Sequence, residues 1–279
     1  MLRPGPDVND VIAYCLAEAA ARHKIELIAW LVMSDHYHAV VRDPEGQLPQ
    51  FLEQFHKMVA RVLNAKWERN ENFWSSEETS VVYLPTPEDV FDKVVYVLSN
   101  PVADHLVETL EEWPGCSAQS NLGGKSTTHA RPRFFFRENG TMPATATLTA
   151  VCPAEIRRNE SVDAWTARVR AAVAERAEHL RTYRMREKIP ILGRRRVLDA
   201  KHTDRAKKPE PFRGLKPCIA CKDIARRIAE LQALKHFRQA HERARVRFAA
   251  GDHKVEFPAG TYRMRAWGAR CEPYPALAA

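Results

Sequence analysis

The run AWLVMSDHYHAVVRD, residues 29–43, constrains the fold of this 279-residue chain more than any other segment. Two apolar stretches surround a short polar break, a pattern that predicts two antiparallel strands over residues 25–33 and 36–42. Side chains alternate between the faces of a strand, so His36 and His38 project from the same face. Two neutral imidazoles on one face form a candidate metal site with open coordination positions. Two strand-end histidines that merely alternate fit the pattern equally well.

A second segment, EDVFDKVVYVLSNPVADHLV, predicts an amphipathic helix. Thr86 and an acidic first turn precede its apolar residues, as in a capped N-terminus. Tyr96 and Asn100 lie four residues apart and share one helix face. Pro101 has no amide donor and predicts a kink or an end at Asn100. An ordinary helix also carries a tyrosine at its apolar rim and an asparagine as a cap, so neither residue alone indicates a site.

Together, the segments MSDHYH and YVLSNPVADHLV resemble the HUH single-tyrosine (IS200-like) transposases, and specifically the branch associated with repeated extragenic palindromes. Tyr37 takes the central bulky position of the first segment, and the resemblance covers residues 11–115. It implies that His36 and His38 bind a divalent metal and that Asn100 completes the ligand set. It also implies that Tyr96 is the nucleophile. Mixed nitrogen and amide-oxygen ligands suit Mg²⁺ or Mn²⁺, with Zn²⁺ also open on ligand type.

The chemistry explains these residue types. A phosphodiester is anionic and its ester oxygen is a poor leaving group, so cleavage at neutral pH requires charge neutralisation and a positioned nucleophile. Attack by Tyr96 would leave a 5′-phosphotyrosine and a free 3′ hydroxyl, and a later hydroxyl could reverse the step on another strand. The resemblance supplies the substrate, single-stranded DNA with folded hairpins. The sequence identifies no base for the phenol proton.

The first 115 residues predict an α+β fold with a ferredoxin-like antiparallel sheet and helices on one face. The predicted order is helix, strand, strand, helix, strand, helix, over residues 10–22, 25–33, 36–42, 49–67, 79–84 and a final helix that carries Tyr96. The first strand of such a sheet is missing, because Pro4 and Pro6 preclude a central strand. A start codon further upstream, which we favour, explains the gap; another segment in its place, such as residues 261–264, and a decaying copy of the gene are the alternatives.

Charge divides the chain into two regions. Residues 1–115 hold nine Lys and Arg against 19 Asp and Glu, whereas residues 116–279 hold 34 against 16. We therefore expect a catalytic unit over residues 1–115 and a basic, mainly helical, DNA-binding extension over residues 116–279. A cationic stretch in the extension predicts a flexible arm along the phosphate backbone, with a solvated linker as the alternative. Its basic residues are Arg194, Arg195, Arg196, Lys201, Arg205, Lys207, Lys208, Arg213 and Lys216.

Two further helices are predicted in the extension, over residues 163–186 and 223–249. The first has Ser161 or Asn159 as its cap, and the second is expected to turn an apolar stripe inward. That stripe consists of Ile224, Ile228, Leu231, Leu234 and Phe237. Cys218 and Cys221 form a CxxC pair that no second pair completes, so a structural zinc site is a minor alternative.

Composition restricts the remaining classes. The sequence has no apolar run of membrane-spanning length and no secretory signal, so we expect no membrane association and reduced thiols in a bacterial cytoplasm, at the nucleoid when DNA is bound. Monomers and homodimers are both open. Three functions remain: an active metal-dependent transposase, a catalytically impaired DNA-binding remnant of one, and an unrelated metallohydrolase with Asp35 as an extra ligand.

Overall fold

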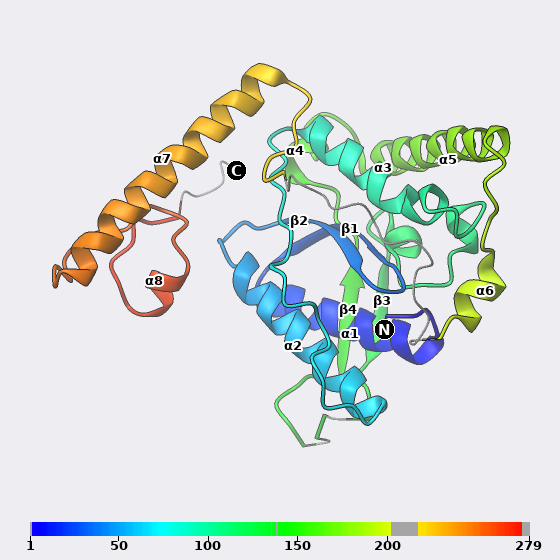
Figure 1. Cartoon of the computed structure of the whole chain (residues 1–279), viewed down its shortest axis with the longest axis horizontal. Helices are drawn as coiled ribbons and strands as arrows, with labels where there is room; N and C mark the ends of the chain where they lie inside the picture. The colour runs from blue at the N-terminus through cyan, green and yellow to red at the C-terminus, as the bar shows by residue number, and fades with distance from the viewer. Residues whose placement is uncertain (1, 135, 138, 202–216, 275–279) are drawn as a thin grey trace.

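The computed structural model describes residues 2–134, 136–137, 139–201 and 217–274 (Figure 1). Its helices and strands are, in chain order, α1 (Pro6–Arg22), β1 (Glu26–Val32), β2 (Tyr37–Arg42), α2 (Leu48–Lys66), α3 (Pro87–Ala103), the 3-10 helices η1 (Leu110–Glu112) and η2 (Ala118–Asn121), β3 (Ser126–Ala130), β4 (Thr145–Thr149), α4 (Ala154–Arg157), α5 (Val162–Arg186), α6 (Arg194–Asp199), α7 (Ile224–Ala249) and α8 (Arg263–Ala266). No helix within these ranges has the length and apolar character needed to cross a membrane.

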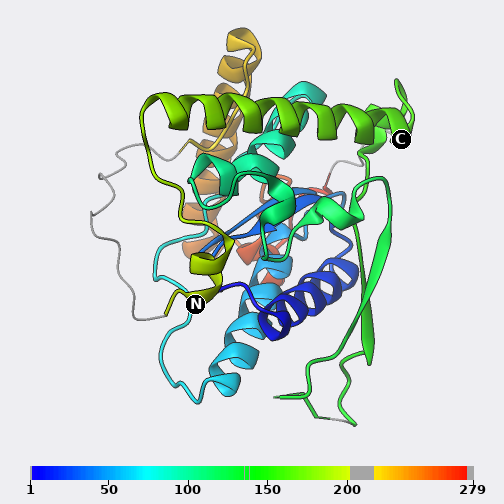
Figure 2. The ribbon, with the colours of Figure 1, turned by 90° about the vertical axis from the view of Figure 1, so that its right-hand side faces the viewer.

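Strands β1 and β2 pair antiparallel, as predicted, and lie between two layers of helices. In both views α3 and α5 lie on one side of this ribbon, and α1 and α2 lie on the other (Figures 1 and 2). Strand β1 is buried from Leu27 to Val32, as expected for a strand covered on both faces. The α+β class is confirmed, but the helices cover both faces of the sheet rather than one. The near-continuous apolar sequence of β1 is the physical reason, because alternate burial would have left every second residue exposed.

The edge of β1 that faces away from β2 is partly covered by other segments of the chain. Two short segments from beyond residue 115 occupy part of this edge. The Val32 amide donates to the Cys116 carbonyl at 2.9 Å, and the Val151 amide donates to the Leu27 carbonyl at 2.7 Å. Leu31 also forms an antiparallel bridge with Ser117. These bonds satisfy backbone groups that a bare edge would expose.

Residues 261–264, suggested as a replacement for the missing first strand, do not form a strand. The chain turns into α8 at Arg263 instead, and Met264 is buried in a small separate core. The strand expected over residues 79–84 is likewise reduced to one isolated bridge, from Tyr83 to Ile219. Neither segment has the long alternating pattern that supports a stable strand.

A second antiparallel hairpin, β3 with β4, packs against α1 and was not predicted. Its strands read STTHA and TATLT, which look polar because only alternate residues, such as Ala146 and Leu148, are buried. In the loop that joins these two strands, the Pro143 carbonyl accepts a hydrogen bond from the Tyr14 hydroxyl of α1 at 2.7 Å. Residues 118–197 of the extension therefore contribute to the same core as the first 115 residues.

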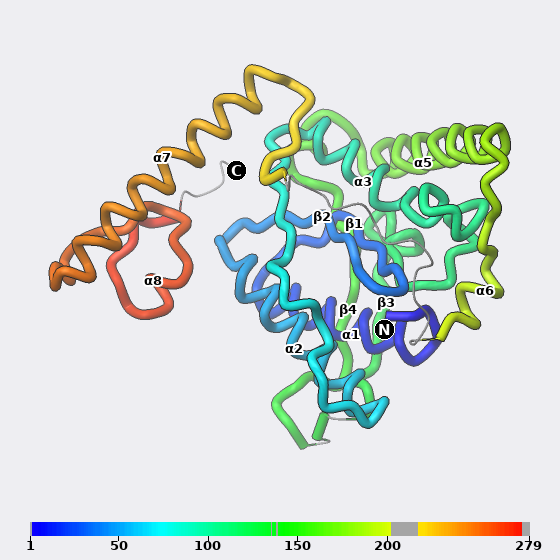
Figure 3. The backbone as a smooth tube through the Cα atoms, viewed as in Figure 1, coloured from blue at the N-terminus to red at the C-terminus, as the bar shows by residue number. Residues whose placement is uncertain are grey.

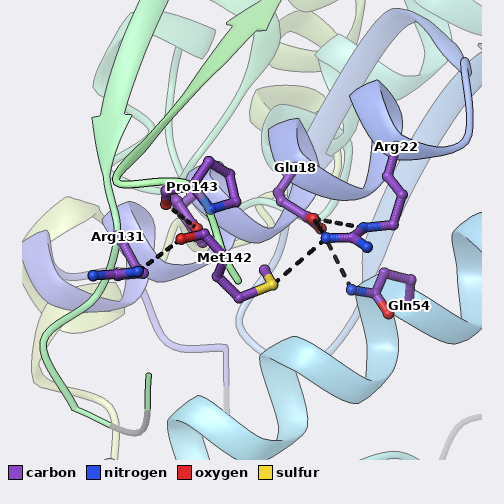
Figure 4. Close-up of polar contacts among 7 residues, drawn as sticks. Glu18, Arg22, Gln54, Arg131, Met142 and Pro143 are labelled. Carbon is purple, nitrogen blue, oxygen red and sulfur yellow. Dashed lines mark hydrogen bonds and ion pairs between the residues drawn. The ribbon is translucent and has the colours of Figure 1, made fainter. Parts of the chain in front are cut away.

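A buried carboxylate joins α1 to α2 and to the loop that follows β3 (Figure 4). Glu18 is 4% exposed, and it accepts hydrogen bonds from Arg22 Nε at 2.6 Å and Gln54 Nε2 at 3.4 Å. The Arg22 guanidinium also reaches the Met142 sulfur at 3.7 Å. A buried carboxylate with these partners stabilises the fold only while they stay in place.

We expect Glu18→Ala to lower the free energy of unfolding by about 1–3 kcal/mol, because it leaves Arg22 and Gln54 without their acceptor. Urea unfolding followed by circular dichroism measures the change. Glu53→Ala, at an exposed position of α2, is the matched control and should stay within about 0.5 kcal/mol of the parent. Equal losses in the two variants would contradict a structural role for Glu18.

The N-terminus of α3 is tied to the chain that leads into α7. The Thr86 side chain caps α3 by accepting from the Asp89 amide at 3.1 Å, as predicted. Asp89 is 6% exposed, and its carboxylate accepts from the Thr86 hydroxyl at 2.7 Å and the Lys222 amide at 3.1 Å. The Tyr83 amide also donates to the Cys218 carbonyl at 2.9 Å. Pro101 does not end α3 at Asn100, because the helix continues to Ala103.

Helix α7 projects from the body of the protein (Figures 1 and 3). The structure confirms a helix here, with Asp223 as its N-cap. The apolar stripe that was expected to face inward is instead largely exposed. Ile224, Ile228 and Leu231 are 62%, 49% and 44% exposed. The small core around Phe257 covers only the C-terminal end of α7, at Ala244. Helix α5 begins with Ser161 as its cap, which was one of the two predicted caps.

Candidate metal and DNA-cleavage site

The two histidines of the MSDHYH segment converge at the start of β2. His36 Nε2 and His38 Nε2 are 3.1 Å apart, and the rings meet edge to face with centroids 4.8 Å apart. The Asp35 carboxylate lies 2.7 Å from His36 Nδ1 and accepts a hydrogen bond from it. That bond orients the His36 ring so that its Nε2 faces His38 Nε2.

This geometry fits a divalent metal ion. Two adjacent ligands of an octahedral ion, each about 2.1 Å from it, lie about 3.0 Å apart, close to the 3.1 Å separation of the two Nε2 atoms. Burial, followed by the charges of His36 and Lys93, lowers the pKa of His38 to about 4, so this imidazole is neutral at pH 7. Within the described ranges, no group of three or more His, Cys, Asp and Glu side chains is arranged to hold a metal. The histidine pair therefore leaves most coordination positions to an amide, water or substrate oxygens.

Tyr96 lies beside this pair. Helix α3 packs across β1 and β2, and the ring centroids of Tyr96 and His38 are 6.1 Å apart. The Tyr96 side chain is 41% exposed, so its hydroxyl is accessible to a large substrate. Asn100 lies one turn further along α3 and is 6% exposed. In the part of the chain that the structure describes, no hydrogen bond joins Asn100 to either histidine. The structure thus brings His36, His38 and Tyr96 together and leaves Asn100 one turn away.

Tyr37 points to the opposite face of β2 from the histidines and anchors the strand there. Its hydroxyl donates to His56 Nε2 at 2.6 Å, and its ring packs edge to face against Phe55 and Trp74. Trp74 Nε1 donates to the His56 carbonyl at 2.9 Å. Burial raises the pKa of Tyr37 above its ordinary value, which keeps the hydroxyl protonated as a donor. His56 thus pairs with a tyrosine 19 positions away in the chain.

We expect Tyr37→Phe to lower the free energy of unfolding by about 1–2 kcal/mol, because His56 Nε2 loses its donor in a partly buried site. Chemical denaturation monitored by tryptophan fluorescence measures this change. Tyr183→Phe on α5, where the side chain is 48% exposed, is the control and should be nearly neutral. A neutral effect of Tyr37→Phe would show that the hydroxyl does not hold the strand.

Two cations that sequence reasoning missed lie next to Tyr96. Lys93, one turn before Tyr96 on α3, places its Nζ 4.8 Å from the centroid of the phenol ring. Arg176 of α5 places its Cζ 5.7 Å from the same centroid. The i, i+3 spacing of Lys93 and Tyr96 was visible in the sequence. Nothing in the sequence pairs Arg176 with Tyr96, because only the packing of α5 on α3 joins them.

The predicted DNA-binding arm is only partly described. Arg194, Arg195 and Arg196 form the short helix α6 instead of an extended arm, because Arg194 donates to the Glu112 carbonyl at 3.2 Å and Arg195 pairs with Asp199 at 3.7 Å. The remaining described residue of the set, Lys201, follows α6 and is exposed. The other members of the arm lie outside the described residues: Arg205, Lys207, Lys208, Arg213 and Lys216.

Comparison with known families gives one match. Residues 5–83 match the model of the family described as Transposase IS200 like. The matched range includes His36 and His38 and ends before Tyr96 and Asn100. No curated protein matches the chain, and no solved structure does. Residues 5–83, which carry the histidine pair, are therefore similar to the IS200-like transposases.

Proposed function

We propose that this protein is a metal-dependent DNA nickase and strand transferase of the branch associated with repeated extragenic palindromes. It acts on single-stranded, hairpin-bearing DNA through a 5′-phosphotyrosine. The similarity of residues 5–83 to the IS200-like transposases supports a transposase function with DNA as the partner. One observation carries the finer proposal: an accessible tyrosine, Tyr96, lies beside His38, whose imidazole meets that of His36 at a separation suited to one ion. A nucleophile beside a metal pair is what phosphodiester cleavage requires.

The ligand atoms suit Mg²⁺ or Mn²⁺, with His36 and His38 as ligands and Asn100 as a third candidate on the helix of Tyr96. When bound, such an ion supplies positive charge to the scissile phosphate and the leaving oxygen. The chain itself orients one imidazole and keeps the other neutral: the Asp35 carboxylate binds His36 Nδ1, and burial lowers the pKa of His38 to about 4. Tyr37 fixes the strand from the other face.

The covalent step balances without another reagent. The Tyr96 hydroxyl oxygen attacks phosphorus, and the new O–P bond forms as the bond from phosphorus to the 3′ oxygen breaks. The electron pair leaves on the 3′ oxygen, which takes up a proton, while the phenol proton is lost to solvent. The products are a 5′-phosphotyrosine and a free 3′ hydroxyl. Attack by the 3′ hydroxyl of another strand reverses the step and joins the two DNA ends.

Incubation of the purified protein with 3′-end-labelled, single-stranded hairpin DNA tests this proposal. Labelling the 3′ end is required because the tyrosine retains the fragment that carries the 5′ phosphate. We expect a labelled protein band on a denaturing gel in Mg²⁺ or Mn²⁺ and none in EDTA. DNA binding without an adduct in either metal would contradict the proposal and leave the catalytically impaired remnant.

A further inference from the structure

The two cations beside Tyr96 have no role in the function proposed so far. Lys93 Nζ and Arg176 Cζ lie 4.8 Å and 5.7 Å from the Tyr96 ring centroid, on the helix of the nucleophile and on a neighbouring helix. Within the described ranges, neither side chain forms an ion pair with a carboxylate. The surrounding unit is acidic, with nine basic against 19 acidic residues up to position 115. The two cations beside the Tyr96 ring are therefore a local exception to the acidic charge of this unit.

The guanidinium of Arg176 also carries an unused donor. Its Nε is buried and has no hydrogen-bond partner among the described residues. Buried polar groups in folded proteins are nearly always paired, and a buried donor atom without an acceptor is costly. An anionic oxygen is the partner that a guanidinium binds most strongly, and phosphate suits its forked geometry. The substrate class that brings such oxygens to Tyr96 is a phosphodiester.

We propose that Lys93 and Arg176 form a phosphate clamp, which binds the non-bridging oxygens of the scissile phosphodiester and holds phosphorus against the Tyr96 hydroxyl. This inference rests on the function proposed above and adds two substrate-binding residues to it. The clamp makes α5, a helix of the extension, part of the active site. It also supplies positive charge from the protein on the Tyr96 side of the phosphate, where charge builds up as the new bond forms.

The competing interpretation is structural. A cation near an aromatic ring stabilises packing by itself, with or without a ligand. The two interpretations differ in their response to salt. Each phosphate contact with single-stranded DNA contributes about 0.7 to the slope of log affinity against log salt. A cation that only packs against the Tyr96 ring contributes nothing to that slope.

The binding test uses the full chain with Tyr96→Phe, which keeps the ring but prevents covalent capture. Fluorescence anisotropy with a short, labelled single-stranded oligonucleotide, in EDTA and over a range of NaCl concentrations, gives the slope. We expect Lys93→Gln and Arg176→Gln each to reduce the slope by about 0.7. Arg170→Gln, at an exposed position of the same helix α5, removes the same charge and should leave the slope unchanged.

The catalytic test uses the protein with Tyr96 intact. We expect Lys93→Gln and Arg176→Gln to slow adduct formation roughly 100-fold, as when one preorganised donor is removed from a charged transition state. Arg176→Lys, which retains the charge, should recover part of the rate, and thermal unfolding checks that each variant folds. An unchanged slope in both Gln variants would overturn the clamp, whatever their adduct rates. A reduced slope in a protein that forms no adduct would sustain the clamp and refute the proposed transposase chemistry.

Discussion

Tyr96→Phe is expected to eliminate the covalent protein–DNA adduct completely. The change removes one oxygen atom and keeps the ring, so the contacts with His38, Lys93 and Arg176 that surround the ring remain. Because the side chain is 41% exposed, stability should change by less than about 0.5 kcal/mol. The loss of product can then be assigned to the lost nucleophile. A denaturing gel with 3′-labelled hairpin DNA measures the adduct, and anisotropy confirms that DNA still binds.

Tyr183→Phe provides the matched control, since this tyrosine is 48% exposed on α5. Adduct formation by this variant should equal that of the parent protein. A residual adduct in Tyr96→Phe would identify another nucleophile. In that case the closeness of Tyr96 to His38 would have no catalytic meaning, and the proposed mechanism would fail at its central residue.

The second large effect concerns the metal. His38→Ala and His36→Ala should each weaken Mn²⁺ binding by more than about 100-fold, because either change removes half of the imidazole pair. Asp35→Asn should weaken it by about 10- to 100-fold, the usual effect of losing the partner that orients a ligating histidine. Titration calorimetry or Mn²⁺ electron paramagnetic resonance in the Tyr96→Phe background, without DNA, measures binding directly.

His179→Ala is the control for these variants, because His179 is exposed on α5 and far along the chain from the pair. It should bind Mn²⁺ as the parent does. With Tyr96 intact, adduct formation should follow the same order. It should be lost in His36→Ala and His38→Ala, reduced in Asp35→Asn and normal in His179→Ala. Tight Mn²⁺ binding by His38→Ala would move the metal site elsewhere and remove the basis for the proposed cleavage.

The sequence predicted those features that depend on neighbours along the chain. Alternation placed His36 and His38 on one face, and the spacing of Tyr96 and Asn100 placed them on one helix. The caps Thr86 and Ser161 followed from local hydrogen bonding.

Features that depend on tertiary packing were missed. Arg176 reaches Tyr96 only because α5 packs on α3, and the partner of the β1 edge comes from residues near Cys116. The β3–β4 hairpin was hidden by its threonines. The helical spacing of apolar residues identified the stripe of α7. Such spacing does not show whether another part of the protein covers the stripe, and Ile224 is 62% exposed.

The hydrogen bond between Asp89 and the Lys222 amide links α3 to the segment that leads into α7. Asp89 stands seven residues before Tyr96 in the same helix, and Lys222 stands at the entrance to α7. A load on α7, such as DNA drawn along the extension, would therefore be transmitted to the helix that carries the nucleophile. Truncating the chain before Lys222 would remove this hydrogen bond from the first turn of α3. Loss of cleavage in such a truncated protein would then have two causes: a less firmly positioned Tyr96 and weaker DNA binding.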